Sequence, residues 1–139
     1  MKYASRTQVP VSRSRSQIEE TVLRYGADQF GSALDNENER AMVQFRLTSW
    51  LVRFILPLSG ASDQQARQRW RALLLVIKAK LEAVESGITT VEEEFLSHIV
   101  VPGGHTFGEW AVPQLRDIKE RGQLPKTILT EIEDQREKR

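Results

Sequence analysis

The sequence predicts an α+β fold, and three observations carry that prediction. Apolar residues alternate with polar ones between residues 41 and 56, which is the period of β-strands with one buried face. From residue 62 onward the apolar residues return at helical spacing. Gly and Pro punctuate the chain between these segments. We therefore expect a short N-terminal helix, a two- or three-stranded antiparallel sheet, and three or four helices packed on one face.

The first fifteen residues are predicted to form a basic, flexible arm. Residues 1–16 contain four cations and no acid, and they show no apolar period. Ser16 and Glu19 then have the spacing of a capping box, which predicts the start of a short helix. Gly26 is a natural left-handed end for that helix.

Two antiparallel strands are predicted from the alternation in RAMVQFRLTSWLVRFILPL, with Thr48-Ser49 as the turn between them. Residues 28–34 are a candidate third strand, and residues 35–38 form the loop that follows it. The residues expected on the buried face are Ala41, Val43, Phe45, Leu47, Val52, Phe54 and Leu56.

The stretch from residue 62 to 86 predicts a long helix that begins at Ser62 and ends at Gly87. One side of this helix carries Ala66, Trp70, Leu73, Leu74, Ile77, Leu81 and Val84. The opposite side carries Ala72, Leu75, Val76, Ala79 and Ala83. A helix that is apolar on two sides is usually packed on both. We expect the first side to pack on the sheet, and the second on later helices or on a second subunit in a homodimer.

Further helices are predicted after residue 90. Thr90 to Glu93 and Thr106 to Glu109 both have capping-box spacing. Pro113 should kink or restart the helix that follows Thr106. A single domain is expected over residues 16–125, and residues 126–139 are expected to form a charged C-terminal helix or tail.

Composition excludes several classes of protein. With 20 Lys and Arg against 19 Asp and Glu, the net charge of +1 gives no global attraction to nucleic acid or to acidic membranes. The absence of cysteine excludes disulfides, thiolate nucleophiles and cysteine zinc sites. No apolar run reaches the roughly 18 residues of a membrane span. The N-terminus lacks the apolar core of a secretory signal, and we expect a protein without membrane contact.

The arginines nevertheless form local concentrations of charge. On the long helix, Arg67, Arg71 and Lys78 lie on one flank of the apolar stripe, and Arg69 and Lys80 lie on the other. One interpretation is a solvated rim whose aliphatic stems cover the core. The other is a strip that contacts DNA phosphates together with the N-terminal arm. The residues predicted for such a strip are Arg6, Arg13, Arg15, Arg67, Arg69 and Arg71.

Acidic residues and histidines offer two further hypotheses. Glu92, Glu93, Glu94 and Glu109 are candidates for contact with a basic protein partner, although acids also suit the starts of helices. Glu94, His98 and His105 are weak candidates for a metal site, because Glu94 and His98 are four residues apart on a helix. The HExxH pattern is absent, and no catalytic triad or cofactor motif stands out. Trp70, Trp110 and Phe107 suit a core better than base stacking.

Residues 67–110, with the string RWRAL followed by VIKAKLEAVESGITT, resemble a family of small, uncharacterised proteins encoded by bacteriophages and prophages. The first thirty residues resemble the start of that family too. Two segments depart from its pattern: LSGASDQQA is shorter than the usual insert, and TILTEIEDQREKR differs at the C-terminus. The resemblance implies a phage accessory protein that acts in the bacterial cytoplasm, and it implies no catalytic residues.

Three functions follow, in order of preference. The first is a non-enzymatic accessory protein with DNA-linked or nucleoprotein-linked binding that supports replication or recombination. The second is a protein that binds and inhibits a host defence system or a host enzyme through its acidic helices. The third is a metal-dependent enzyme. No cofactor is expected, and the partner is a host or phage protein or DNA.

Overall fold

The computed structural model describes residues 8–126 and 135–138 of the chain. The chain divides into two compact units, Met1–Gly108 and Glu109–Arg139. The single domain predicted from the sequence ends at residue 125, which is beyond this boundary at Gly108. The elements in chain order are α1 (Gln8–Arg24), β1 (Gln29–Asp35), β2 (Arg40–Leu47), β3 (Trp50–Pro57), α2 (Asp63–Ser86), α3 (Val91–Phe95), the 3-10 helix η2 (Leu96–His98) and α4 (Phe107–Glu120).

The three strands form one antiparallel sheet in the order β1-β2-β3, which confirms the predicted α+β fold. Strand β2 alternates between buried and half-buried residues, as its period of two predicts. Thr48 and Ser49 connect β2 to β3 with φ of 48° and 72°. Two successive left-handed residues define the tight hairpin turn whose twist matches that of the strands. The predicted turn is therefore confirmed, although its residues are not the usual Asn-Gly.

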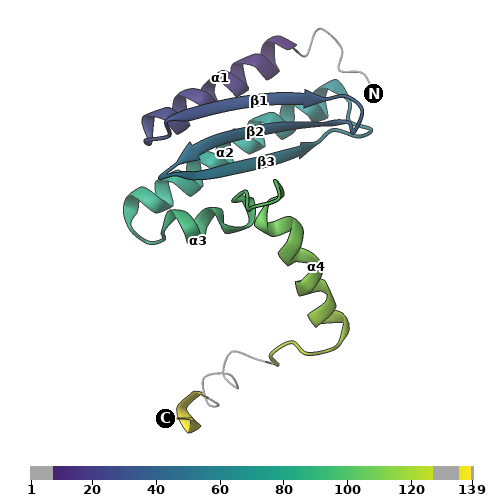
Figure 1. Ribbon diagram of the computed structural model, residues 1–139. Coiled ribbons are helices and arrows are strands. Elements are labelled where there is room, and N and C mark those ends of the chain that lie inside the picture. Colours follow the sequence, from purple (N-terminus) through teal and green to yellow (C-terminus); the bar gives the residue numbers. More distant parts are fainter. Residues whose placement is uncertain (1–7, 127–134, 139) are drawn as a thin grey trace. The chain divides into compact units, whose positions relative to one another are not determined.

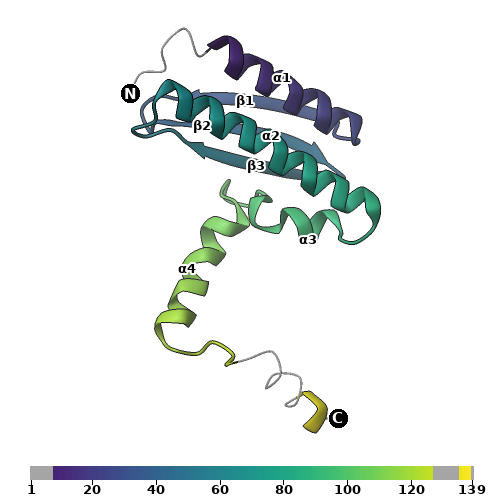
Figure 2. The same ribbon diagram turned by 180° about the vertical axis from the view of Figure 1, so that it is seen from behind.

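Helices α1 and α2 lie side by side on one face of the sheet (Figures 1 and 2). Between these helices and the sheet lies the core, and all seven strand residues expected on the buried face are buried. Phe95 from α3 completes it, because its ring meets those of Phe45 and Phe54 edge-on at centroid distances of 5.9 and 6.3 Å. Trp70 is a core residue as predicted, and its indole N–H has no hydrogen-bond partner among the described residues.

Helix α1 begins at Gln8, so the prediction of a flexible arm over residues 1–15 is wrong from Gln8 onward. Ser16 lies inside the helix and is not its N-cap. Pro10 falls in the first turn, where its missing N–H costs no intrahelical hydrogen bond. Near the start of the helix, Val11 packs against the core. Nearer its end, Ile18 and Val22 are fully buried in the core. The basic segment is thereby fixed against the rest of the unit.

Helix α2 begins and ends where the sequence predicts. The Ser62 hydroxyl accepts a hydrogen bond from the Gln65 amide at 3.2 Å, and the Gln65 side chain accepts one from the Ser62 amide at 2.8 Å. Gly87 closes the helix with φ of 84°. The side that carries Trp70 packs in the core as predicted. On the opposite side, however, Leu75 and Val76 are 56% and 44% exposed. Helix α3 does not cover that side.

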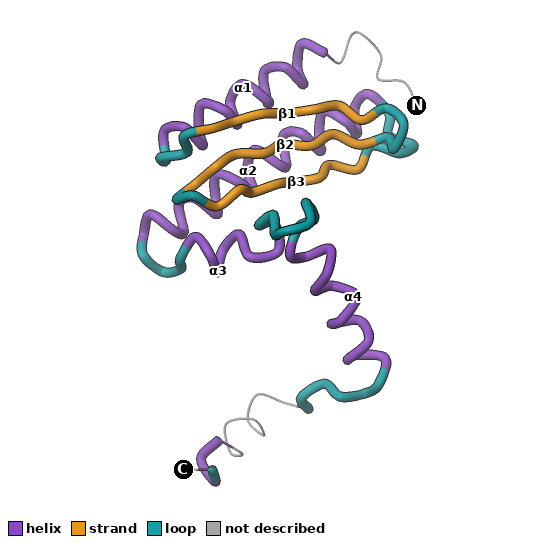
Figure 3. Tube along the Cα trace, viewed as in Figure 1, coloured by secondary structure: helices purple, strands orange, loops and turns teal. Residues whose placement is uncertain are grey.

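Helix α3 packs on the flank of α2 that carries Lys80. The Lys80 ammonium donates a hydrogen bond to the Glu94 carbonyl at 3.1 Å and lies 3.4 Å from the Glu94 carboxylate. Thr90 caps α3 by accepting from the Glu93 amide. The chain then runs along β3, where the Val100 amide donates to the Leu51 carbonyl at 2.8 Å (Figure 3). This segment therefore covers one edge of the sheet.

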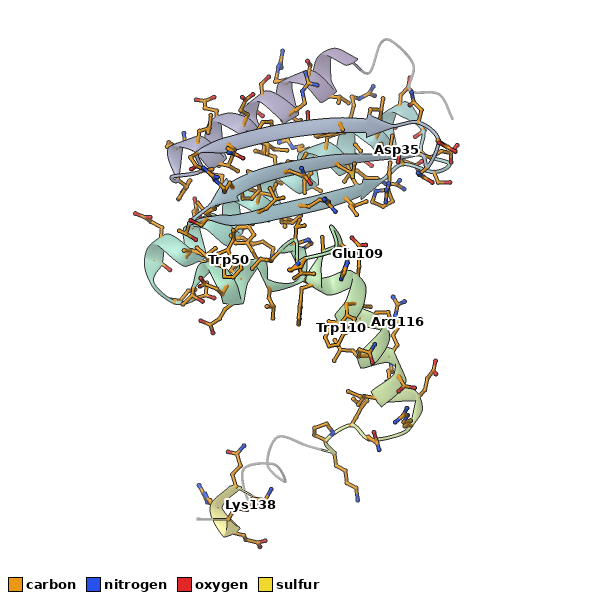
Figure 4. All side chains as sticks on the ribbon, in the orientation of Figure 1. Asp35, Trp50, Glu109, Trp110, Arg116 and Lys138 are labelled. Atoms are coloured by element: carbon orange, nitrogen blue, oxygen red, sulfur yellow. The ribbon has the colours of Figure 1, made fainter. Side chains whose placement is uncertain are left out.

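Helix α4 begins at Phe107 and extends into the second unit. It continues through Pro113 to Glu120, so the predicted restart at the proline is wrong. Trp110 projects from this helix and is 54% exposed (Figure 4). Residues 135–137 are helical, but most of the C-terminal helix predicted for residues 126–139 lies outside the described residues.

Candidate nucleic-acid interface

A groove of about 740 Å³ separates the N-terminal halves of α1 and α2. Polar and basic side chains from both helices meet there, and two leucines of α2 contribute an apolar part of its wall. The residues that line it are Arg13, Ser14, Gln17, Gln64, Arg67, Gln68, Arg71, Leu74 and Leu75. The lining contains three cations and no acid. Its basic side chains suit an anionic ligand that accepts hydrogen bonds.

Arg13, Arg67 and Arg71, which we call the groove arginines, come from two helices that are far apart in the sequence. None of the three has a hydrogen-bond or ion-pair partner among the described residues. Arg67 and Arg71 are four residues apart, so they lie about 6 Å apart along α2 on the same side. Three guanidinium groups thus line one groove, and their hydrogen-bonding capacity is unused within the described part of the chain.

The structure separates the remaining predicted cations from the groove. Arg69 lies on the other flank of α2, where it donates a hydrogen bond to the Pro57 carbonyl at 2.8 Å. Arg15 is exposed on α1 but does not line the groove. Arg6 lies outside the described residues. Half of the predicted strip is therefore brought together, and Arg69 has a structural partner instead.

Four neutral polar residues of the groove were missed by sequence reasoning: Ser14, Gln17, Gln64 and Gln68. A signal for two of them was present in the sequence. Gln64, Arg67, Gln68 and Arg71 occupy positions i, i+3, i+4 and i+7, which form one continuous row on a helix. The amide groups of glutamine donate and accept hydrogen bonds, so they extend the groove's capacity to hold oxygen atoms.

A different set of cations occupies the outer face of the sheet, which is the face turned away from α1 and α2 (Figure 1). We call Arg40, Arg46 and Arg53 the sheet arginines. Arg46 forms a two-point ion pair with Asp28, with N–O distances of 2.8 and 2.6 Å. The hydrogen bond from Arg46 lowers the pKa of the Asp28 carboxyl, and Asp28 raises the pKa of Arg46.

The other two sheet arginines are also paired. Arg40 donates to the Asp35 carboxylate at 3.2 Å, and the hydrogen bonds from Asn38, followed by that from Arg40, lower the pKa of Asp35. Arg53 donates to the Gln44 side chain at 2.6 Å and to the Gly104 carbonyl at 2.7 Å. Each sheet arginine is therefore used to hold the fold.

The acidic candidates are mostly engaged within the chain. Glu92 accepts a hydrogen bond from the indole N–H of Trp50 at 2.8 Å, which lowers the pKa of Glu92. Figure 4 shows Trp50 at the end of the sheet nearest α3, far from Asp35. Glu93 takes part in the Thr90 cap, and Glu94 pairs with Lys80. Glu109 belongs to the second unit, so it is not placed relative to the other three acids.

Two of the three candidate metal ligands have other roles. Glu94 pairs with Lys80, and the His98 ring stacks on Phe54 at a centroid distance of 4.0 Å. Burial, with a smaller effect from the positive charge of Lys80, lowers the pKa of His98 from its ordinary value of 6.5. The described parts of the chain contain no group of three or more His, Cys, Asp or Glu side chains that could hold a metal ion. The metal site proposed from Glu94, His98 and His105 is therefore not formed.

Comparison with known proteins adds no further constraint on this site. No family model, curated protein or solved structure matches the chain. Among the described residues, every helix is too short or too polar to cross a membrane. A functional assignment therefore depends on the chemistry of the groove.

Proposed function

We propose that this chain is a non-enzymatic binding protein that holds the phosphates of nucleic acid in the groove between α1 and α2. The observation that supports the proposal most is the convergence on one groove of three arginines that have no partner in residues 8–126 and 135–138, without an acid in the groove's lining. Guanidinium groups bind phosphate oxygens by charge-assisted hydrogen bonds, often two at a time. A phosphate backbone would supply the partners that these arginines lack within the described residues.

The composition of the groove also suggests the mode of binding. No aromatic residue lines it, so it offers no platform on which bases could stack. Arginine contacts to phosphates position a nucleic acid but do not read its sequence. We therefore expect binding with little sequence preference and with a strong dependence on salt.

The cellular role is proposed from the resemblance of residues 67–110 to phage and prophage proteins. In that setting the chain would be an accessory protein of the bacterial cytoplasm that supports replication or recombination by associating with DNA or nucleoprotein. The resemblance covers both sides of the groove, because Arg13 lies in the first thirty residues and Arg67 and Arg71 lie in residues 67–110.

The proposal is tested by titrating salt while measuring the affinity for single- and double-stranded DNA. We expect the affinity to fall steeply as salt rises, because each phosphate contact releases counterions. Two matched pairs of variants locate the site: Arg13→Ala should weaken binding more than Arg15→Ala, and Arg71→Ala more than Arg69→Ala. If neither form of DNA binds at about 50 mM salt, where phosphate contacts are strong, the proposal fails.

A second candidate function is inhibition of a host protein through the region around α3. The favouring observation is that Glu92 and Glu93 remain exposed beside two exposed apolar residues, Ile88 at 82% and Leu96 at 48%. Acidic and apolar groups together suit a basic protein partner. A pulldown from host lysate with the wild type and a Glu93→Lys, Leu96→Glu variant tests it, because a specific partner should be captured only by the wild type.

A further inference from the structure

The outer side of α2 is an apolar strip that points away from the sheet. Leu75 and Val76 are 56% and 44% exposed, and Ala72 and Ala79 beside them are exposed too. Ala83 is half-buried at one edge of the strip. A large residue pair flanked by small residues gives a surface with both projections and hollows, which allows a second helix to approach closely.

We propose that two copies of the chain associate through this strip, with their α2 helices antiparallel about a twofold axis near Val76. This proposal does not depend on nucleic-acid binding, although it shares Arg71 and Leu75 with the lining of the groove. In a twofold interface each residue i that meets residue j is matched by j meeting i. With the axis between residues 76 and 77, Leu75 and Val76 of one copy pack against Ala79 of the other, and Ala72 packs against Ala83.

The charged residues at the edge of the strip favour the antiparallel arrangement. Arg71 and Glu82 lie on the same flank of α2, and both are exposed without a partner among the described residues. They are equally distant from the proposed axis, so each Arg71 faces Glu82 of the second copy. The interface then contains two identical ion pairs. The helix dipoles are also antiparallel, which is their favourable orientation.

A parallel pairing of the same strip would be disfavoured. A parallel twofold pair would place the flank that carries Arg71 opposite the flank of the second copy that carries Arg69 and Lys80, and like charges opposite one another are destabilising. It would also bring the basic N-terminal halves of both α2 helices together, where Arg67 adds to the repulsion. The charge pattern therefore favours the antiparallel copy as the occupant of this surface.

Sedimentation equilibrium of the nucleic-acid-free protein over a range of concentrations tests the association. We expect a reversible dimer for the wild type and a monomer for Val76→Glu. The control is Ile88→Glu, which places the same charge at a more exposed apolar position beyond α2 and should still dimerise. A monomeric wild type at high micromolar concentration overturns the proposal, and so does a Val76→Glu variant that dimerises like the wild type.

Charge reversal tests the register. Glu82→Arg should weaken the dimer about tenfold, because it replaces two weak exposed attractions by two repulsions. Adding Arg71→Glu to Glu82→Arg should restore the dimer, because the pairs are then reversed but complete. If the double variant is weaker than Glu82→Arg alone, Arg71 does not meet Glu82 and the proposed register is wrong.

Disulfide cross-linking gives an independent measure of the geometry, because the chain has no cysteine of its own. Val76→Cys lies next to the axis and should form an intermolecular disulfide rapidly under mild oxidation. Ala72→Cys should not, because its two copies would be about 14 Å apart along the helices, well beyond the roughly 7 Å limit between Cα atoms. Rapid cross-linking of Ala72→Cys but not Val76→Cys would overturn the antiparallel pairing.

Discussion

The groove and the outer face of the sheet each present three arginines, but the two sets differ in their partners. Every sheet arginine donates hydrogen bonds to an acid, an amide or a backbone carbonyl of its own unit. The groove arginines have no such partner among the described residues. Arginines are therefore paired within the unit on its outer sheet face, and those of the groove on the other side have no partner among the described residues.

This difference shows that the number of cations on a surface is a poor guide to binding. An arginine already bonded to a carboxylate must lose that bond before it can hold a phosphate. An unpartnered arginine loses only water, and its bonds to a charged ligand are worth more than bonds to a neutral one. The groove is the better candidate site for this reason, although both regions hold three positive charges.

The largest expected effect is a loss of DNA affinity when the groove arginines are replaced, because the sheet arginines should contribute little to that affinity. Replacing all three groove arginines by alanine should reduce the affinity at low salt by at least about 100-fold, if each contact is worth on the order of 1 kcal/mol. The slope of log affinity against log salt should fall in magnitude by about 2 for single-stranded DNA and by nearly 3 for double-stranded DNA, because three phosphate contacts are lost. Fluorescence anisotropy with a labelled oligonucleotide measures both quantities.

The matching change on the sheet should alter stability and not binding. Arg53→Ala removes the donor to Gln44 and to the Gly104 carbonyl, and we expect the free energy of unfolding to fall by about 1 kcal/mol. Arg53→Lys keeps the charge but not the planar pair of donors, so it should restore only part of that loss. Urea denaturation measures the effect, and a loss of DNA affinity in Arg53→Ala at unchanged stability would contradict the comparison.

Removing a groove arginine should raise the free energy of unfolding, whereas removing the sheet arginine Arg53 should lower it. Arg67 and Arg71 are like charges at positions i and i+4, which destabilise a helix by about 0.2–0.5 kcal/mol. Arg71→Gln should therefore stabilise the unit slightly at low salt, and the gain should shrink as salt screens the repulsion. Thermal unfolding at two salt concentrations detects this. At concentrations where the protein is monomeric, a clear destabilisation by Arg71→Gln would mean that Arg71 has a structural partner within its own unit.

The smallest expected effect is on the stability of the unit at low pH. The folded-state pKa values of Asp28 and Asp35 are lowered below 3.8, so these carboxylates contribute stability above that pH. That contribution is lost as the pH falls from 3.8 through the folded-state pKa values. The double variant Asp28→Asn, Asp35→Asn should therefore lose less stability than the wild type over that pH interval. Glu20→Gln, an exposed acid without a partner among the described residues, is the control and should follow the wild type.

The sequence predicts the sheet and α2 well because each has an apolar pattern of one clear period. Residues 41–47 and 52–56 have an apolar residue at every second position, and α2 has seven apolar residues on one side between a capping serine and a glycine. The start of α1 was missed because its apolar residues are sparse. Val11 and Ile18 are seven residues apart, and the serines and arginines between them give no amphipathic signal.

The candidate site was predictable only in part. Helical spacing correctly separates Arg67 and Arg71 from Arg69, because it fixes the flank of α2 on which each residue lies. It cannot show that α1 packs against the first flank and brings Arg13 there. That juxtaposition depends on the packing of two helices on one sheet face. Whether an arginine has an internal partner is likewise decided by tertiary contacts.

The most direct test of the groove as the binding site is an NMR titration of the arginine side-chain Nε–H signals with an oligonucleotide. These signals report each guanidinium separately, so the two regions are compared in one experiment. We predict that the signals of Arg13, Arg67 and Arg71 shift on binding, while those of Arg40, Arg46 and Arg53 stay in place. Shifts confined to the sheet arginines, with the groove signals unmoved, would contradict the account.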